Sequence, residues 1–432
     1  MSATTSDPGV AAAPSLFRNR NYVWLWAGGA ISSLGDYFTF VAMPWLVLSL
    51  THDAAALGLV MALESLPRAA FMLFSGSATD RFSARSVLLA SRCGFLLALV
   101  ALAALLLSGG LRLPHLYGFA VSFGLLSAFA LPANRAMLPL VVERTQIQKG
   151  NSALMGTQQL IQLFAPVLAG LLIAVGANDA AGAGVRPIAY AFLLNAAAIA
   201  VALGLLLQVR VPARSGSSGP PKAGLAEGFR YLRQDVGMRT ATLYMGCIGF
   251  FAIGPLLTVL PQLAQQRLHD GALSYGLLCA VNGVGSMLGF ALGGMLPKPG
   301  ARQLGLRMLA ADIVAGLAIL WLGQADRFAT AAPALALVGV AASYGGVLAL
   351  SWVQERVPVA LSGRVLGIVM FAVLGLTPVS MALAGLLAAY ASLAALLTTS
   401  GTAIVAVALL GLLVPGINRF GTQPPPAAYA AA

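Results

Sequence analysis

Long apolar runs alternate with short polar connections along almost the whole chain. A helix needs about 20 apolar residues to cross the hydrocarbon of a bilayer, so each run is long enough to be a transmembrane span. The runs are rich in Ala, Gly and Leu and do not alternate in short segments, which favours closely packed helices over barrel strands. The pattern therefore predicts an all-α integral membrane protein with twelve spans, at roughly 22–49, 56–79, 87–109, 114–138, 150–176, 188–209, 240–264, 273–296, 304–324, 331–353, 365–390 and 394–415.

Composition removes the soluble classes of protein. Hydrophobic residues make up 59% of the 432 residues and charged residues only 9%, against about 45–50% and about 25% in soluble domains. Mean hydropathy is +0.88. Because so few charges cannot cover a soluble surface, most of the chain is expected to face lipid or other helices.

The excess of basic residues indicates orientation rather than nucleic-acid binding. With the N-terminus placed in the cytoplasm, 18 of the 25 Lys and Arg residues fall on the cytoplasmic side, 4 fall outside and 3 lie within spans. This is the positive-inside bias of a bacterial inner-membrane protein, and it predicts that both termini are cytoplasmic. The sequence has no basic stripe with interleaved aromatic residues, which is the pattern expected of a nucleic-acid-binding surface.

The longest connection, residues 210–239, divides the spans into six and six. It begins with RVPARSGSSGPPK, which is typical of a flexible linker. The N-terminal residues lack a basic n-region, so the first span is expected to be retained rather than cleaved. The predicted units are a disordered tail at 1–16, a six-helix bundle at 17–209, the central loop at 210–239, a second bundle at 240–416 and a tail at 417–432.

The second part of the central loop, GLAEGFRYLRQD, has a helical pattern. Its apolar residues stand at helical spacing, with arginines on the other side. The apolar residues are Leu225, Phe229, Leu232 and Val236, and the arginines are Arg230 and Arg233. This predicts an amphipathic helix that lies on the cytoplasmic surface of the membrane.

The two halves repeat each other weakly. Glu143–Arg144 recurs as Glu355–Arg356, and Ala165–Pro166 recurs as Thr377–Pro378, both at an offset of 212 residues. Two related six-helix bundles with a substrate site between them are a known transporter architecture. Together with the span count, the repeat predicts two pseudo-symmetric bundles.

A short motif between spans two and three carries a family resemblance. The stretch GSATDRFSAR has the form G-x-x-x-D-R-x-S-x-R and resembles the loop signature of the major facilitator superfamily, from which Ala84 departs. The stretches LFRNRNYVWLWAGGAISSLGDYFTFVAMPWLVLSLT, LPANRAMLPLVV and GFRYLRQD are similar to its enterobactin-exporter and macrolide-efflux permease branch. The resemblance implies the twelve-span fold and transport out of the cell. The residues that match the loop signature are Gly76, Asp80, Arg81, Ser83 and Arg85.

The charges of this stretch have two interpretations. Asp80 is placed to meet a helix N-terminus or a basic side chain of the opposite bundle, and Arg81 and Arg85 can pair across the seam. Such contacts would form a gate that opens with the cytoplasmic side. Alternatively, the arginines only anchor the loop at the anionic surface, and for Arg85 the two interpretations stay open. An acid does nothing for topology, so the gate is favoured for Asp80.

Ionisable residues inside spans are expensive and are functional candidates by default. Asp36 is the first candidate, because Ser32, Ser33 and Thr39 give its helix face a polar character. A carboxylate that dries out binds a proton more readily, which is the minimum that proton coupling needs. The alternative is a structural aspartate that is hydrogen-bonded to a neighbouring helix.

The other charges within spans receive lesser roles. Arg135 in span four is predicted to pair with Asp36 when the proton leaves, or else to extend to the interface. Glu64 is a further coupling candidate, but Arg68 four residues later can neutralise it within one helix. Arg92 and Asp312 are expected to form stabilising pairs near the interface.

Span five combines amide side chains with a predicted bend. Gln158, Gln159 and Gln162 offer donors and acceptors either to a substrate or to other helices. The following APVLAG keeps Pro166 and Gly170 of the resembled antiporter signature, although alanines replace two glycines. Proline frees backbone groups, so a bend at the seam between bundles is expected.

These features predict a secondary active transporter, most simply a proton-coupled exporter of a small apolar or amphipathic compound such as a drug or siderophore. The alternatives are a uniporter or importer and, more remotely, a membrane-embedded enzyme. The sequence has no phosphate-binding loop, H-E-x-x-H or G-x-S-x-G motif, and its cysteines and histidines lack metal spacing, so no catalytic residue, cofactor or metal is predicted. The expected partners are the substrate, protons and the lipid bilayer, with the chain as a monomer.

Overall fold

The computed structural model describes residues 16–143, 146–177, 186–210, 225–268, 271–297, 299–358 and 361–414. Within these ranges the side chains of 72–81, 176–177, 225–226, 301–302 and 362–363 are not described. The described residues form a short 3-10 helix, η1 (Leu16–Arg18), and fourteen α-helices. Twelve stretches are long and apolar enough to cross a membrane, which confirms the predicted all-α fold with twelve spans.

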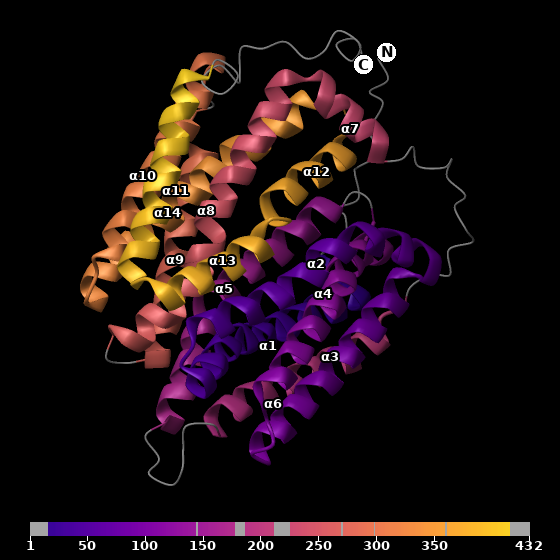
Figure 1. Cartoon of the computed structure of the whole chain (residues 1–432). Helices are drawn as coiled ribbons and strands as arrows, with labels where there is room; N and C mark the ends of the chain where they lie inside the picture. Colours follow the sequence, from indigo (N-terminus) through magenta and orange to yellow (C-terminus); the bar gives the residue numbers. More distant parts are fainter. Residues whose placement is uncertain are drawn as a thin grey trace, which may run out of the picture.

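Six of the helices form a first bundle and seven form a second bundle, and one short helix lies between them in the chain (Figure 1). The first bundle contains α1 (Arg20–Thr51), α2 (Ala54–Phe82), α3 (Ala84–Leu107), α4 (Leu113–Val141), α5 (Ile147–Ala177) and α6 (Arg186–Gln208). The second bundle contains α8 (Val236–Gln266), α9 (Gly271–Met295), α10 (Ala301–Gly323), α11 (Phe328–Arg356), α12 (Ser362–Leu374), α13 (Thr377–Tyr390) and α14 (Leu393–Leu413). The short helix is α7 (Leu225–Gln234).

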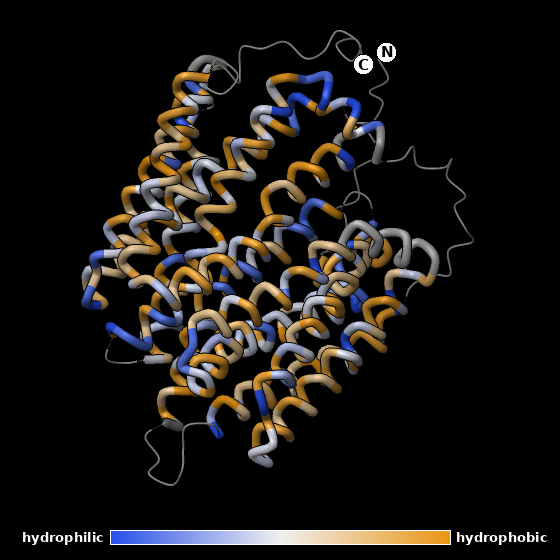
Figure 2. Tube along the Cα trace, in the orientation of Figure 1, coloured by the Kyte–Doolittle hydropathy of each residue, from blue (hydrophilic) through white to orange (hydrophobic). Residues whose placement is uncertain are grey.

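α1 runs from Arg20 to Thr51, and the two ends of the molecule are therefore called the Arg20 side and the Thr51 side. Successive spans are antiparallel, so α2 begins on the Thr51 side and α5 and α8 begin on the Arg20 side. Figure 2 shows hydrophobic positions along the helices of both bundles and hydrophilic positions gathered at many helix ends, including the corner between α7 and α8.

Short polar residues begin several of the helices. The side chain of Asn19 accepts from the backbone N–H of Tyr22 at 3.3 Å, and that of Asp53 accepts from Ala55 at 2.8 Å. Each satisfies one of the backbone donors that a helix start leaves without an intrahelical partner. His52, in the left-handed region with φ 50°, lets α1 and α2 follow each other closely.

One predicted span is not a single helix. The run predicted at 365–390 consists of α12 and α13, separated at Gly375 and Leu376. Pro378 lies in the first turn of α13, where its missing N–H costs nothing, whereas in a continuous helix its ring would clash with the preceding turn. The proline therefore places the break.

Small residues allow the helices within each bundle to pack closely. A Cβ atom at Gly124 of α4 would overlap the carbonyl of Glu64 on α2, and one at Gly289 of α9 would overlap the carbonyl of Val340 on α11. Such backbone contacts are the usual way in which helices associate in lipid. They fix the relative positions of the spans, and hence of the charged residues on them.

The two bundles contact each other mainly through two helix pairs, α2 with α13 and α5 with α9. Gly58 and Gly385 meet backbone to backbone in the first pair, and Gly276 meets the carbonyl of Pro166 in the second. Among the described residues, these tight approaches lie between the middle of the spans and the Thr51 side. The predicted repeat relates the two pairs. α5 is the fifth span of the first bundle and meets α9, the second span of the second bundle, whereas α13 belongs to the fifth span of the second bundle and meets α2, the second span of the first.

Helix α7 lies at the Arg20 end and packs against the second bundle through one face. Tyr231 is fully buried, and Gly228 packs against Arg364 and Ile368. Phe229 and Val236, two residues of the predicted apolar face, are each 56% exposed, so this face is free to meet lipid. The structure begins α8 at Val236, directly after Asp235.

Candidate functional site

The central feature of the first bundle is an ion pair between two spans. Arg92 of α3 directs Nη1 to both oxygens of Asp36 on α1, at 3.0 and 3.1 Å. The Arg92 side chain is 17% exposed and that of Asp36 is 37% exposed. An ion pair whose members face the interior of a helical bundle stabilises two charges that would otherwise be costly inside a membrane.

In this structure the partner of Asp36 is Arg92, a residue that was expected to form a stabilising pair. Arg135 of α4 is exposed, which fits the alternative in which it extends to the interface, and its pairing with Asp36 stays a prediction. α3 and α1 both pack against α4 and α6, which brings Arg92 within reach of Asp36.

Glu64 and Arg68 confirm the prediction of a pair within one helix. Their side chains meet at 2.7 Å, four residues apart on α2. Glu64 is thus neutralised locally, whereas Asp36 depends on another span for its cation. A pair of this kind contributes only about 0.2–0.5 kcal/mol to an isolated helix.

The glutamines of α5 lie where the bundles begin to separate. Gln158, Gln162, Pro166 and Gly170 follow each other at intervals of four, so they share one face of α5. Backbone atoms of Gln162 and Pro166 lie close to Gly283 and Gly276 of α9, and Gly170 lies close to the start of α9. Gln158 is one turn nearer the Arg20 side and is exposed.

Gln158 also reaches the first helix. Its Nε2 donates to Ser33 Oγ of α1 at 2.6 Å, so two predicted substrate residues form one polar contact. Gln159 and Gln162 are half-buried. Pro166 and Gly170 are buried against α9, which places the predicted bend at the contact between the bundles.

The predicted gating stretch is mostly helical. α2 continues to Phe82, so Ser83, with φ 70°, is the residue that joins it to α3. Gly76, Asp80 and Arg81 lie in a stretch whose side chains fall outside those that the structure describes. The described member, Arg85, donates to the carbonyl of Leu207 on α6 at 2.8 Å, a contact within the first bundle rather than across the seam.

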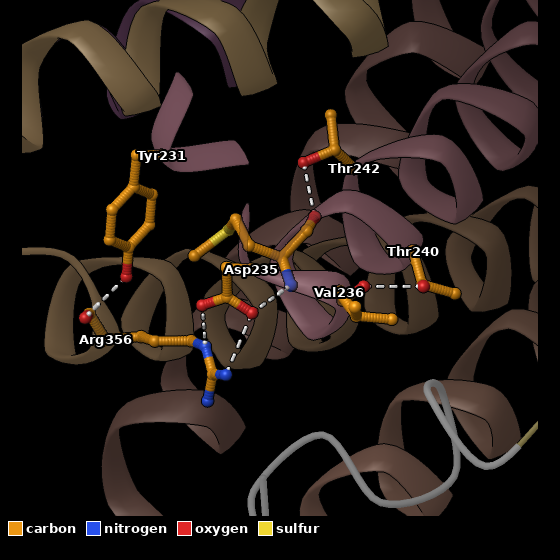
Figure 3. Close-up of polar contacts among 7 residues, drawn as sticks. Tyr231, Asp235, Val236, Thr240, Thr242 and Arg356 are labelled. Carbon is orange, nitrogen blue, oxygen red and sulfur yellow. Dashed lines mark hydrogen bonds and ion pairs between the residues drawn. The ribbon is translucent and has the colours of Figure 1, made fainter. Parts of the chain in front are cut away.

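A second ion pair, which the sequence did not reveal, attaches α7 to α11 (Figure 3). Arg356 donates from Nε and Nη2 to the two oxygens of Asp235, at 2.6 and 2.9 Å. The two side chains are 7% and 1% exposed. Asp235 also accepts from the backbone N–H of Met238 at 3.0 Å, so it begins α8 as well as binding the arginine.

Further contacts surround this pair. Tyr231 donates to the carbonyl of Arg356 at 3.1 Å, and the guanidinium lies 5.3 Å from the ring centre of Trp352. Nearer the start of α7, Glu227 pairs with Arg364 of α12. Two sequence signals fall on this site, the recurrence of Glu-Arg at 143 and 355 and the stretch GFRYLRQD, which contains Tyr231 and Asp235, but neither identified Asp235 as the partner of Arg356.

Asp312 has a neutral partner rather than a cation. Tyr244 of α8 donates to its Oδ2 at 2.5 Å, which joins α8 to α10. The prediction of a stabilising contact for Asp312 fits this arrangement, although the partner is a phenol. Unlike Asp36, this carboxyl forms no ion pair with a basic side chain among the described residues.

Two bundles of six spans with charged and amide side chains inside them define a multi-pass membrane transporter rather than an enzyme. Residues 25–377 match the Major Facilitator Superfamily, and the chain belongs to that superfamily. The resemblance predicted from the loop signature is therefore confirmed.

Known relatives agree with this assignment. The chain is 26% identical over 389 residues to the enterobactin exporter EntS of Citrobacter koseri, covering 89% of each chain. It superimposes on a POT family transporter solved with 5-aminolevulinic acid at a TM-score of 0.73, with 13% identity and coverage of 94% and 97%. A D-xylose-proton symporter gives a TM-score of 0.70, with 16% identity and coverage of 93% and 99%. The two structures share the fold.

Proposed function

We propose that this transporter is a proton-coupled exporter of a small apolar or amphipathic compound, such as a siderophore or drug. The observation that carries the proposal is the ion pair between Asp36 and Arg92, which joins two spans inside the first bundle. A carboxylate that exchanges an arginine for a proton can link protonation to the packing of those spans. The likeness to enterobactin exporters supports the outward direction.

The distribution of arginines supports a cytoplasmic Arg20 side. Among the described residues, Arg20, Arg85, Arg230, Arg233 and Arg239 are some of the many that lie there, and positive charge favours the cytoplasmic side of the inner membrane. Since the bundles contact each other towards the Thr51 side, the proposed conformation gives access from the cytoplasm. In an antiporter this is the state that releases a proton and takes up substrate, and an ionised Asp36 paired with Arg92 fits it.

The proposal is tested by transport in inverted membrane vesicles that carry an imposed pH gradient. Enterobactin and a panel of macrolides are added while a pH-sensitive dye reports proton release. We expect release with wild type and its loss with Asp36→Asn, because the amide cannot exchange a proton. Asp312→Asn is the matched control, since it also changes a carboxyl within a span, and it should retain release.

Other outcomes would reject parts of the proposal. Equal release from wild type and Asp36→Asn would remove Asp36 from the coupling step. Equilibration of a compound across the membrane with no proton release would favour a uniporter over an antiporter, whereas exit of a preloaded compound together with protons would favour an importer.

A further prediction concerns the amide at the separation of the bundles. Gln158→Leu is expected to raise the KM for transported compound about threefold to tenfold, because one hydrogen bond is worth about 0.5–1.5 kcal/mol. The Gln148→Leu variant, at an exposed position in the first turn of the same helix, should leave KM unchanged. Initial rates in the vesicle assay measure both, and an unchanged KM in Gln158→Leu would assign Gln158 to holding Ser33 alone.

A further inference from the structure

A small cavity lies inside the Arg20 half of the first bundle, with α1, α3, α4 and α6 as its walls. Its volume is about 30 Å³. One buried water occupies about 10–15 Å³ on this scale, so the cavity has room for about two waters. Residues of the second bundle do not contribute to its described lining, which includes Trp24, Gly28, Gly29, Ser32, Arg92 and Asn134.

The cavity has the polar groups that a bound water requires. Ser32 is 3% exposed, and its Oγ has no hydrogen-bond partner. Arg92 and Asn134 line the same space. A buried water usually makes about three hydrogen bonds, and buried hydroxyls are almost always paired. The unpaired hydroxyl of Ser32 therefore points to water rather than to an empty apolar void.

The cavity lies between the Arg20 end of the bundle and the ion pair. On α1, Gly28, Ser32 and Asp36 follow each other at intervals of four and share one face. Trp24, within the first two turns of α1, lines the Arg20 end of the cavity, and Arg92, which binds Asp36, lines the other. The distance along α1 from Trp24 to Ser32 is about 12 Å, at 1.5 Å per residue.

We infer that this cavity is a water site that carries protons between Asp36 and the Arg20 side, separately from the path of the substrate. The inference rests on the proposed function and adds the route. Asp36 itself does not line the cavity, so the proton reaches it at the Arg92 end: when Asp36 loses its proton, the carboxyl O–H bond breaks, a new O–H bond forms on a water at that end, and this water passes a proton towards the Arg20 side. The carboxylate that remains accepts from Arg92. Because the walls all belong to the first bundle, substrate between the bundles does not block this route.

The first test measures water access without transport. Ser32→Cys is made in a chain whose Cys93, Cys247 and Cys279 are replaced by serine, and inverted vesicles are treated with Ag⁺, a thiol reagent small enough to enter a space that holds about two waters, while the loss of free thiol is followed. We expect it to react at least about tenfold faster than Val41→Cys, because Val41 is fully buried on the same helix. In right-side-out vesicles the same reagent should react slowly. Equal rates for the two cysteines would overturn the water site.

The second test fills the cavity. A Cβ at Gly29 meets no atom within 4 Å, so Gly29→Leu can extend its side chain into the space that the waters would occupy. Gly204→Leu on α6 is the matched control, since a Cβ there is equally unopposed and Gly204 does not line the cavity. Gly29→Leu should slow the labelling of Ser32→Cys about tenfold, whereas Gly204→Leu should not.

The same variants separate the proton route from the transport step. With enterobactin as the added compound, Gly29→Leu should lose proton release but keep substrate-for-substrate exchange, which moves no net proton. Gly204→Leu should keep both, and size-exclusion profiles confirm that each variant is folded. Undiminished release from Gly29→Leu would overturn the route. If wild type releases no proton, the proposed coupling and the proton route fail together, while fast labelling of Ser32→Cys would still support the water site.

Discussion

Arg356→Met is expected to lower the free energy of unfolding by about 3–5 kcal/mol, because it leaves the carboxylate of Asp235 buried without its cation. The loss of a guanidinium over the ring of Trp352 adds to this effect. The measurement is thermal unfolding of the purified protein in detergent, followed by tryptophan fluorescence and by the fraction that remains monodisperse.

Two variants control this result. Arg364→Met breaks the pair with Glu227, whose side chain is 41% exposed, so its cost should stay below about 1 kcal/mol. The double variant Asp235→Asn with Arg356→Met should recover much of the stability, because the amide still begins α8 and no charge is left buried. Equal losses in Arg356→Met and Arg364→Met would mean that the buried pair contributes no more than the exposed one.

Gly58→Val is expected to reduce transport about 100-fold while the protein remains folded. A side chain at Gly58 overlaps the backbone of Gly385 in the opposite bundle, so it penalises the conformation that is closed on the Thr51 side. Overpacking of this kind costs up to about 3 kcal/mol, which corresponds to about 100-fold in the population of that conformation. The measurement is the initial rate of substrate-for-substrate exchange in vesicles.

Comparison variants identify the cause of the loss. Gly156→Val on α5 should transport normally, because a Cβ there meets nothing within 4 Å. Gly124→Val overlaps the backbone of Glu64 inside the first bundle, so it should destabilise the folded protein rather than shift its conformation. If Gly58→Val unfolds as readily as Gly124→Val, the contact with Gly385 is needed for folding and not only for closure.

Features that depend on neighbours along the chain were predictable from the sequence. The number of spans follows from the length of the apolar runs, and the pair of Glu64 with Arg68 follows from a spacing of four on one helix. The repeat of Pro166 and Pro378 also predicted two related bundles. These predictions required no knowledge of which helices are adjacent in space.

Features that depend on helix adjacency were not predictable. Asp36 and Arg92 are 56 residues apart, and their contact requires α3 to present its inner face to α1. At the end of α7, apolar periodicity predicted the face that contains Phe229, but it did not predict that Asp235 is buried in an ion pair with Arg356. Buried ion pairs between distant segments leave no periodic signal in the sequence.

The attachment of α7 has a practical use for spectroscopy. Because Asp235 and Tyr231 hold α7 against α11, a label on α7 reports the position of the second bundle without perturbing a span. Gln234 is exposed on α7, and Lys149 is exposed at the start of α5 on the same side of the molecule. Spin labels at these two positions would therefore measure the opening and closing of the carrier as a distance distribution, and fluorophores would follow it in single molecules over time.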